Sequence, residues 1–462
     1  MINRNLSRRN FLKLSGSAAA IALSGAHARG IMRAAPYRQD VTTISFGGWG
    51  GVAEDEGVQE AIKVFQQENP GIAVQWQHTP DAGEYSRVTL TNIAAGTAPD
   101  TSFIRANDYE TLRSQGLLLD ITDLIKSDPL LGQENYFIEP QETNRCADSN
   151  GRWHGIGSTW VAHHIYYNAE LFDQAGITPP GFQDSEIWDW DNFVEIAKQL
   201  TVDSAGRHPG DAGFDADDIQ QWGVDWGSTW WMPIAAAVHA NGGKFLTEDG
   251  MIGLDSPEAM EAMQRLSDLI YVHKVAPRSA SMADLGMTNT QMIDNGRLAM
   301  AVDGSWALSW MNPSLVSVPM GTGALPKMTQ PASIMQAHFH SILSSTQKPE
   351  ESWQWVRFLA TPFYQAHFAK IGLWIPNQSA MLTPEGLSTW VTEGIHPENY
   401  SQFATDYLPN HGVSVRLPSG YIEAEANFLT PAFEALNAGT PVEQVIPDAV
   451  RQANDVIAMA QI

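Results

Sequence analysis

The chain has 462 residues and a formal net charge of −25, with 27 lysines and arginines against 52 aspartates and glutamates. A surface this acidic repels phosphate backbones and anionic lipids, so the composition argues against nucleic acid as a partner. The length exceeds what one hydrophobic core usually serves, which predicts two domains. Cys146 is the only cysteine, so no internal disulfide can form and the fold is expected to rest on packing.

The N-terminal segment has the pattern of an export signal. Arg8 and Arg9 stand side by side in a polar stretch, an apolar run follows at 18–23, and small residues occupy Ala26 and Ala28. This pattern resembles a twin-arginine signal peptide, which implies transport of the folded protein by the twin-arginine translocase. The simpler alternative is a basic N-terminal tail.

The sequence after the signal favours a free periplasmic protein. Residues 29–40 mix Arg, Pro and Gln without periodicity, which predicts a disordered lead-in. No later segment has the ~20 apolar residues that span a bilayer, and Cys146 lies too far from the signal to carry a lipid anchor. We therefore predict a signal peptide over 1–28 and localisation in the periplasm.

Strands and helices alternate from residue 41 onward. Apolar residues predict a strand over 41–46 that runs into a glycine-rich loop, followed by a helix in which Val58, Ile62 and Phe65 share a face. The same rhythm continues with a strand at 72–76, a helix at 84–95 and a strand at 101–104. This order predicts an α/β fold with a mostly parallel sheet.

The rest of the chain continues as α/β without internal repeats. Strands are predicted at 164–168 and, fully buried, at 298–302, while the polar segment 203–218 is expected to be a surface insertion. Further helices are predicted at 191–200, 231–239, 257–273, 290–295, 351–360, 423–436 and 442–459.

Two groups of residues could suggest a metal ion. The histidines at 163–164 and at 338 and 340 are spaced so that they do not share one face of an element, and no Cys or Glu joins them at metal-binding spacing. The aspartates of 211–218 could hold calcium, but the segment lacks the glycine and terminal glutamate of an EF-hand loop. We predict no metal and no cofactor, and calcium at 203–218 stays an open alternative.

Tryptophan is unusually abundant, with 16 in the chain. A buried indole needs a hydrogen-bond partner for its N–H, so tryptophan is a demanding residue for simple core filling. Aromatic faces stack on the C–H faces of sugar rings, and acidic side chains accept hydroxyl protons. The composition therefore indicates carbohydrate binding, although many of these residues are also expected in the core.

Several segments in order resemble family 1 of the extracellular solute-binding proteins, the receptors of ABC sugar importers that include maltodextrin-binding protein. One of them is Asp303-Gly304-Ser305-Trp306, which follows the predicted buried strand. The segments that carry the resemblance are 65–72, 94–100, 153–172, 188–193, 231–243, 295–306 and 323–326.

The resemblance implies a two-lobed periplasmic binding protein fold, with a ligand cleft between α/β lobes joined by crossing strands. By analogy, lobe 1 comprises 41–157 and 342–405, and lobe 2 comprises 158–341 and 406–462. The implied partners are a saccharide or polyol ligand and the membrane permease of an ABC importer, and the implied oligomeric state is a monomer.

Candidate ligand-binding residues follow from the resemblance and from their chemistry. In the family an aromatic side chain at the position of Trp306 stacks on the sugar. Trp230 is favoured over Trp231, because adjacent helix residues face different ways, and Trp374 is interpreted as structural. Charged side chains are candidates for binding hydroxyl groups through strong hydrogen bonds, with solvated caps or ion pairs as the alternative. The predicted ligand-binding residues are Trp49, Glu84, Tyr85, Asp100, Arg105, Trp160, Trp226, Trp230, Asp303, Trp306, Arg416 and Tyr421.

Catalytic signatures are missing from the sequence. We find no nucleophile-elbow serine, no His-Glu-x-x-His and no phosphate-binding loop. The predicted function is therefore capture of a sugar or related polyhydroxylated solute for import, with no chemistry of its own. The alternative is a secreted carbohydrate-active enzyme such as a glycosidase, which needs two carboxylates in the cleft.

Overall fold

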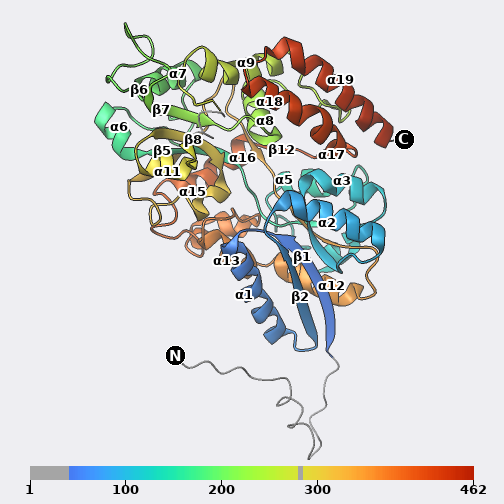
Figure 1. The fold of residues 1–462 in the computed structure, drawn as a ribbon. Helices are drawn as coiled ribbons and strands as arrows, with labels where there is room; N and C mark the ends of the chain where they lie inside the picture. The colour runs from blue at the N-terminus through green and yellow to red at the C-terminus, as the bar shows by residue number, and fades with distance from the viewer. Residues whose placement is uncertain (1–40, 279–284, 462) are drawn as a thin grey trace, which may run out of the picture. The chain divides into compact units, whose positions relative to one another are not determined.

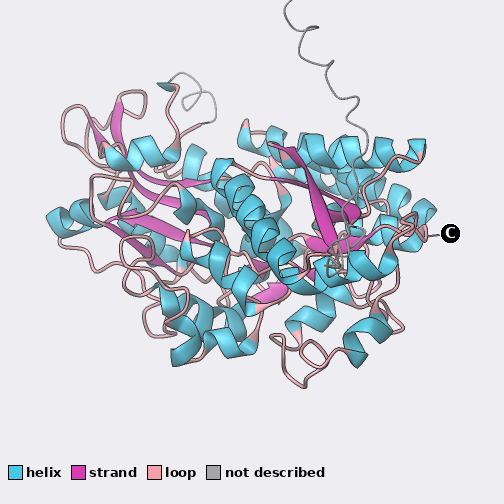
Figure 2. Cartoon of the chain, turned by 90° about the horizontal axis from the view of Figure 1, so that it is seen from below, coloured by secondary structure: helices cyan, strands magenta, loops and turns pink. Residues whose placement is uncertain are grey.

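The computed structural model describes residues 41–278 and 285–461, whose strands form two five-stranded sheets and one two-stranded pair (Figure 1). Figure 2 shows the strands in two groups with helices around each. The α/β class predicted from the sequence is confirmed. The signal residues Arg8 and Arg9 and the predicted lead-in 29–40 lie outside the described residues.

The first sheet is parallel on one side and antiparallel on the other. β1 pairs in parallel with β2 and β3, whereas β11 runs antiparallel to β3 and β4. The expectation of a mostly parallel sheet thus holds for its first three strands only, because β11 enters from a distant part of the chain in the opposite direction. In spatial order the strands are β2 (Ile72–Thr79), β1 (Thr42–Trp49), β3 (Thr101–Ile104), β11 (Phe339–Ile342) and β4 (Ile156–Gly157).

Helices cover this first sheet through apolar faces. In α1 the predicted stripe of Val58, Ile62 and Phe65 is buried in one cluster with Phe46 and Trp355. Burying each such side chain contributes about 1.5–3 kcal/mol relative to leaving it exposed. The helices of this part are α1 (Val52–Glu68), α2 (Ala82–Ala95), α3 (Ala106–Ser114), α4 (Thr122–Ser127), α5 (Gln141–Cys146), α12 (Pro349–Leu359) and α13 (Pro362–Lys370).

The second sheet contains the predicted buried strand at its centre. β8 pairs in parallel with β7 and antiparallel with β5. The strands are β6 (Val202–Asp203), β7 (Ile219–Trp226), β8 (Leu298–Gly304), β5 (His163–Asn168) and β9 (Met320–Gly323). The helices around it are α6 (Ala169–Ala175), α7 (Trp190–Gln199), α8 (Trp231–Ala240), α9 (Pro257–Tyr271) and α11 (Asn289–Asp294).

The C-terminal part packs mainly on the second sheet's core. The helix predicted over 423–436 is α17, a π-helical turn η4 and α18 in succession. The elements after β9 that are not named above are β10 (Ser333–Met335), η2 (Ser379–Leu382), α14 (Pro384–Leu387), α15 (Tyr400–Gln402), η3 (Phe403–Tyr407), α16 (Leu408–His411), β12 (Gly412–Ser414), α17 (Tyr421–Ala424), η4 (Glu425–Leu429), α18 (Thr430–Asn437) and α19 (Val442–Ala460).

The lobe boundaries expected from the resemblance stay predictions. The one placed at 341/342 divides β11, all four residues of which pair in the first sheet. In addition, Met381, Trp390 and Tyr400 share a hydrophobic cluster with Tyr166 of β5, although the predicted boundaries assign them to the other lobe.

A buried ion pair lies beside β4, where the chain passes from the first sheet toward the second. Arg145 Nη2 is 2.6 Å from Glu142 Oε2, and both side chains are fully buried. The Arg145 guanidinium lies 3.6 Å from the ring centroid of Trp160. Gly157 N donates to Glu142 Oε1 at 3.0 Å, and a Cβ on Gly157 would overlap the guanidinium. The pair therefore connects α5 to the crossing backbone.

The polar insertion between β6 and β7 is organised by its own aspartates. Asp203 accepts backbone N–H bonds from Ala205, Arg207 and Asp215, and Asp211 accepts one from His208. Within the part of the chain that the structure describes, no group of three or more His, Cys, Asp or Glu residues is placed to hold a metal ion.

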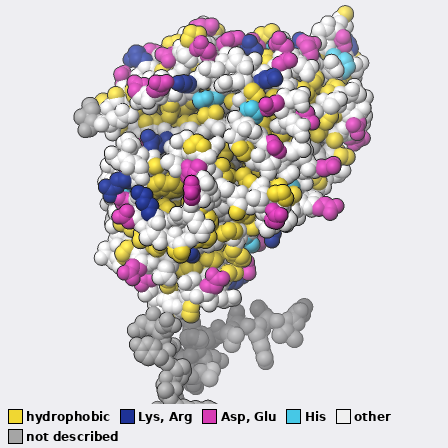
Figure 3. Space-filling model, turned by 180° about the vertical axis from the view of Figure 1, so that it is seen from behind, with side chains coloured by type: hydrophobic (Ala, Val, Ile, Leu, Met, Phe, Trp, Pro, Cys, Tyr) yellow, Lys and Arg dark blue, Asp and Glu magenta, His cyan; other side chains and the backbone are white. Residues whose placement is uncertain are grey.

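The surface is acidic, as the composition requires. Figure 3 shows aspartates and glutamates scattered over one face of the molecule. No helix among residues 41–278 and 285–461 is long and apolar enough to cross a membrane.

Candidate ligand-binding cavity

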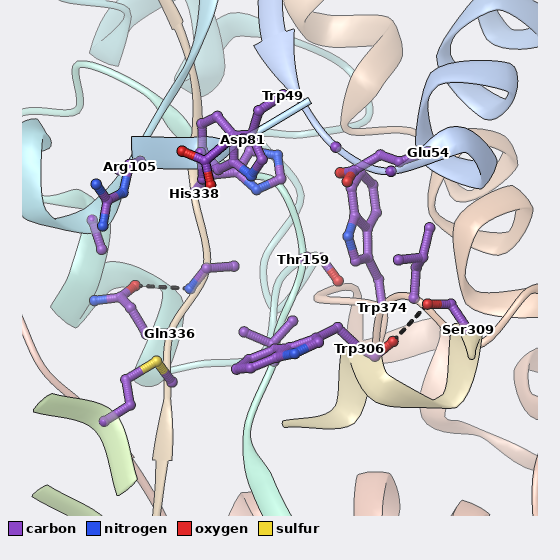
Figure 4. Close-up of a pocket in the computed structure, with 18 of the residues that line it drawn as sticks. Trp49, Glu54, Asp81, Arg105, Thr159, Trp306, Ser309, Gln336, His338 and Trp374 are labelled. Carbon is purple, nitrogen blue, oxygen red and sulfur yellow. Dashed lines mark hydrogen bonds between the residues drawn. The ribbon is translucent and has the colours of Figure 1, made fainter. Parts of the chain in front are cut away.

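A cavity of about 770 Å³ opens between elements of the two large sheets (Figure 4). Its walls come from the carboxyl ends of β1 and β3, the start of α1, the start of α8, the 3-10 helix η1 (Ser305–Ser309) and the crossing segment before β11. Open α/β sheets bind ligands at the carboxyl ends of their strands, and this volume is in the range of small-molecule pockets. The position and size therefore make this cavity the candidate site.

Six tryptophans line the cavity. Large indole faces provide apolar contact area, and an N–H that opens into a cavity is a free hydrogen-bond donor. They are Trp49, Trp230, Trp231, Trp306, Trp310 and Trp374. Both members of the pair at 230 and 231 reach the wall, although Trp231 is only 3% exposed and also belongs to the core.

Trp49 lines the cavity as the last residue of β1 rather than as part of a loose glycine loop. Its ring centroid lies 4.9 Å from that of His338, 5.5 Å from Phe103 and 5.6 Å from Tyr85. The glycines around Trp49 in the sequence have no side chains to pack it, and its packing partners come from other strands and from α2. Trp49 is therefore held in place before any ligand arrives.

The position of the Trp306 ring depends on Gly304, two residues before it in the chain. Gly304 has φ of −76°, which any residue can adopt. A Cβ at that position would lie 2.2 Å from the Trp306 ring, so the glycine is needed because the indole folds back over it. The ring also lies 5.3 Å from His163 and 6.0 Å from Trp230.

Trp374, interpreted from the sequence as structural, has both roles in this structure. It stacks on Phe368 with a centroid separation of 4.1 Å, and it lines the cavity. The sequence around Trp374 could not show whether this residue lies in the core or in a cavity wall, because its neighbours in space lie on α13 and at the start of α1.

Three charged side chains line the cavity: Glu54, Asp81 and Arg105. Glu54, in the first turn of α1, is 8% exposed, and burial raises its pKa to about 8. Asp81 is exposed and its Oδ1 accepts the Glu84 N–H at 2.7 Å, which caps α2. Figure 4 shows Glu54 beside Trp374 and Arg105 on the opposite side of the cavity.

Three neutral polar side chains of the wall are already engaged in hydrogen bonds. Thr159 donates to the carbonyl of Ile375, Ser309 to that of Trp306, and Gln336 to that of Val415. His338 is buried, which holds the pKa of its imidazole well below the usual range and keeps the ring neutral. These residues and Glu54 were missed because they come from segments with no recognisable binding pattern.

Four of the twelve predicted ligand-binding residues line the cavity: Trp49, Arg105, Trp230 and Trp306. Arg105 is the N-cap residue of α3 and directly follows β3. Each of the other three also stands at the carboxyl end of a strand or at the start of a helix or 3-10 helix.

Three predicted residues of the first half lie elsewhere. Glu84 is exposed on α2, and Tyr85 is buried with its hydroxyl 2.5 Å from Ser102 Oγ. Asp100 precedes β3 and so lies at the opposite end of that strand, where it accepts from Ser45 and Thr346. Burial acts to raise the pKa of Asp100, but these hydrogen bonds lower it overall.

The remaining predicted aromatic residues are part of the core. Trp160 is fully buried against Arg145, and Trp226 packs against Trp190 with centroids 5.8 Å apart. Tyr421 is fully buried in the core cluster of the second sheet, with its hydroxyl 3.3 Å from Glu425 Oε1.

Two predicted charged residues also lie outside the cavity wall. Asp303 accepts the Gly304 N–H at 2.7 Å, and burial raises its pKa to about 6. Arg416 donates to the carbonyl of Ala147 and lines a separate cavity of about 980 Å³ beside α3 and the C-terminal helices.

Two α/β halves with an aromatic cavity at their strand ends define the two-lobed periplasmic binding protein fold. The chain matches the bacterial extracellular solute-binding protein family over residues 49–366. It belongs to that family.

Similar proteins agree with this assignment. A curated binding protein of Brucella abortus is 24% identical over 356 residues, which are 76% of this chain and 75% of that protein. The arabinooligosaccharide-binding protein of Halalkalibacterium halodurans is 27% identical over 251 residues, 54% of this chain and 50% of that protein. An ABC substrate-binding protein of Listeria monocytogenes, solved in complex with cycloalternan, has the same fold with a TM-score of 0.76 at 21% identity, covering 91% of this chain and 100% of that one.

Proposed function

We propose that this protein is the solute-binding component of an ABC importer. It captures a sugar or related polyhydroxylated solute in the cavity and delivers it to the membrane permease in the periplasm, as a monomer and without chemistry of its own. The observation that carries this proposal is the set of six tryptophans around one cavity. Family membership and the relatives named above support the class of ligand and the permease as partner.

Capture requires that the ligand contact both halves of the molecule. Trp49 and Arg105 approach from the first sheet, and Trp230 and Trp306 approach from the second. A ligand shifts an open–closed equilibrium only by its differential affinity for the two states. Closure around the solute is therefore favoured by contacts on both sides. Asn107, which also lines the cavity, donates to Glu425 of η4 at 2.5 Å and links α3 to the C-terminal helices.

The proposal is tested by thermal-shift screening of the mature protein against neutral mono- and oligosaccharides and alditols. A true ligand at a hundredfold excess over Kd is expected to stabilise the fold by about 2.7 kcal/mol. Chromatography of the recovered ligand should show it intact. If no compound of the panel stabilises the protein, or if a bound glycoside is hydrolysed above the buffer rate, the proposal is wrong.

Replacing Trp306 with alanine is expected to weaken binding of a solute found in that screen. The lost apolar contact corresponds to roughly 1.5–3 kcal/mol, which is about ten- to hundredfold in Kd. Titration calorimetry measures this loss, and urea unfolding of the same variant measures fold stability. A variant that binds the solute like wild type but unfolds at a much lower urea concentration would show that Trp306 is a core residue and not a ligand contact.

Export through the twin-arginine route is expected to depend on the arginine pair. Replacing Arg8 and Arg9 together by lysine should leave the precursor in the cytoplasm, because the pair is the feature that such signals present to the translocase. Immunoblots of periplasmic and cytoplasmic fractions measure the outcome. Unchanged periplasmic delivery of the double variant would show that the general secretion route suffices.

A further inference from the structure

Glu54 differs from the other charged groups of the cavity because, in the part of the chain that the structure describes, no cation or hydrogen-bond donor pairs with its carboxyl group. Asp81 is exposed and caps a helix, and Arg105 lies close enough to Asp108 and Glu425 for its charge to act on both carboxyls. Glu54 is 8% exposed, and within residues 41–278 and 285–461 no hydrogen bond or ion pair reaches its carboxyl group. It is a buried, unpartnered polar side chain in the wall of the cavity.

The surroundings of this carboxyl are aromatic and tightly packed. Trp374 lies beside it in Figure 4, and Trp49 and Trp306 line the same cavity. On the other side, a Cβ on Gly50 would lie 2.1 Å from Glu54 Oε2, so the carboxyl group rests directly on the backbone. Tyr364 of α13 is also close enough for the charge of Glu54 to act on its hydroxyl.

A ligand that carries one cationic group fits this arrangement better than a neutral ligand. Burial raises the pKa of Glu54 to about 8, so at neutral pH the carboxyl keeps its proton as long as no cation lies beside it. A neutral hydroxyl group does not change this, because it cannot balance the charge of the ionised form in apolar surroundings. An ammonium group compensates the charge through a charge-assisted hydrogen bond and is attracted to indole faces through cation–π contact. The net charge of −25 also favours the approach of cations.

We infer that the solute is a polyhydroxylated compound with a protonated amine, such as an amino sugar or amino polyol, and that its ammonium group pairs with Glu54 against the indole faces. This inference rests on the proposed function and specifies its ligand class. Glu54 is then the residue that selects the amine over the hydroxyl, while the tryptophans provide stacking area for the ring or chain.

Matched pairs of probes test the inference by titration calorimetry at neutral pH and low salt. The pairs are glucose with 2-amino-2-deoxyglucose and with 6-amino-6-deoxyglucose, cellobiose with the β-1,4-linked glucosamine disaccharide, and sorbitol with 1-amino-1-deoxysorbitol. At least one amine is expected to bind about tenfold or more tightly than its hydroxyl counterpart.

Two variants of α1 separate the role of Glu54 from general electrostatics. Glu54→Gln is expected to abolish the preference for the amine, because glutamine keeps the shape of the side chain but cannot ionise to pair with an ammonium group. Glu56→Gln makes the same change at an exposed position of the same helix, two residues further along the chain, and is expected to keep the preference for the amine. Glu54→Asp, which retains the charge, should keep the direction of the preference.

Each result decides the matter. Hydroxyl partners that bind as tightly as the amines in every pair, or an amine preference that survives Glu54→Gln, overturn the inference and leave the proposed function standing. Failure of both members of every pair overturns the inference, and if the neutral panel above also fails, the proposed function is lost with it.

Discussion

Replacing Arg145 with methionine is expected to lower the free energy of unfolding by about 3–5 kcal/mol. Both Arg145 and Glu142 are fully buried, and Arg145 donates two hydrogen bonds to Glu142 Oε2, at 3.0 and 2.6 Å. Burial raises the pKa of Glu142, and the guanidinium offsets part of that effect. Removing the arginine leaves a buried carboxyl without its cation and removes the surface on which Trp160 stacks.

Urea unfolding followed by tryptophan fluorescence measures this loss. Arg451 is a matched control, because it pairs with Asp448 at the same i,i+3 spacing on the exposed face of α19, at 2.8 Å. Arg451→Met is expected to leave the unfolding midpoint unchanged, since exposed pairs contribute little. Equal destabilisation of the two variants would show that burial does not determine the value of the pair.

Glu54→Gln is expected to change how fold stability depends on pH. In the folded protein burial raises the pKa of Glu54 from 4.5 to about 8. Between these pH values the folded carboxyl keeps its proton while the unfolded one loses it. The free energy of unfolding of the wild type therefore falls as pH rises, by about 1.4 kcal/mol per pH unit from this group. Glutamine does not titrate, so the variant escapes this loss.

Urea unfolding at about pH 5, 6, 7 and 8 measures this effect, because these values span the interval between the ordinary and the raised pKa of Glu54. The free energy of unfolding of Glu54→Gln, relative to that of the wild type, should increase as pH rises. The expected increase between pH 5 and pH 8 is on the order of several kcal/mol. Glu56→Gln, exposed on the same helix, should run parallel to wild type. Parallel curves for Glu54→Gln as well would contradict the buried, unpartnered state of Glu54.

Local patterns in the sequence were sufficient to predict the helices and strands that form the cavity. The apolar stripe of α1 and the buried strand β8 were predicted because helix and strand periodicity is a property of neighbouring residues. Trp49, Arg105, Trp230 and Trp306 line the cavity, and each directly ends or follows a strand or opens a helix or 3-10 helix.

The misplaced residues show where such local reasoning fails. Asp100 and Arg105 stand on either side of β3, yet only Arg105 reaches the cavity, because the strand carries the two residues to opposite ends of the sheet. Tyr85 and Trp226 had suitable chemistry but point into packed cores, where Ser102 and Trp190 meet them. Residue type alone does not distinguish a ligand contact from a core contact.

By itself the sequence determined the α/β class and the family, because both depend on local order along the chain, and its composition showed the abundance of tryptophan. Only the tertiary structure decided that Glu54, His338 and Trp374 share one cavity. These residues come from the start of α1, the segment before β11 and the loop after α13, which meet only after long-range pairing and packing. The Glu54 carboxyl, on which ligand selectivity is proposed to depend, is buried by that packing, and none of the residues that the structure describes pairs a cation with it.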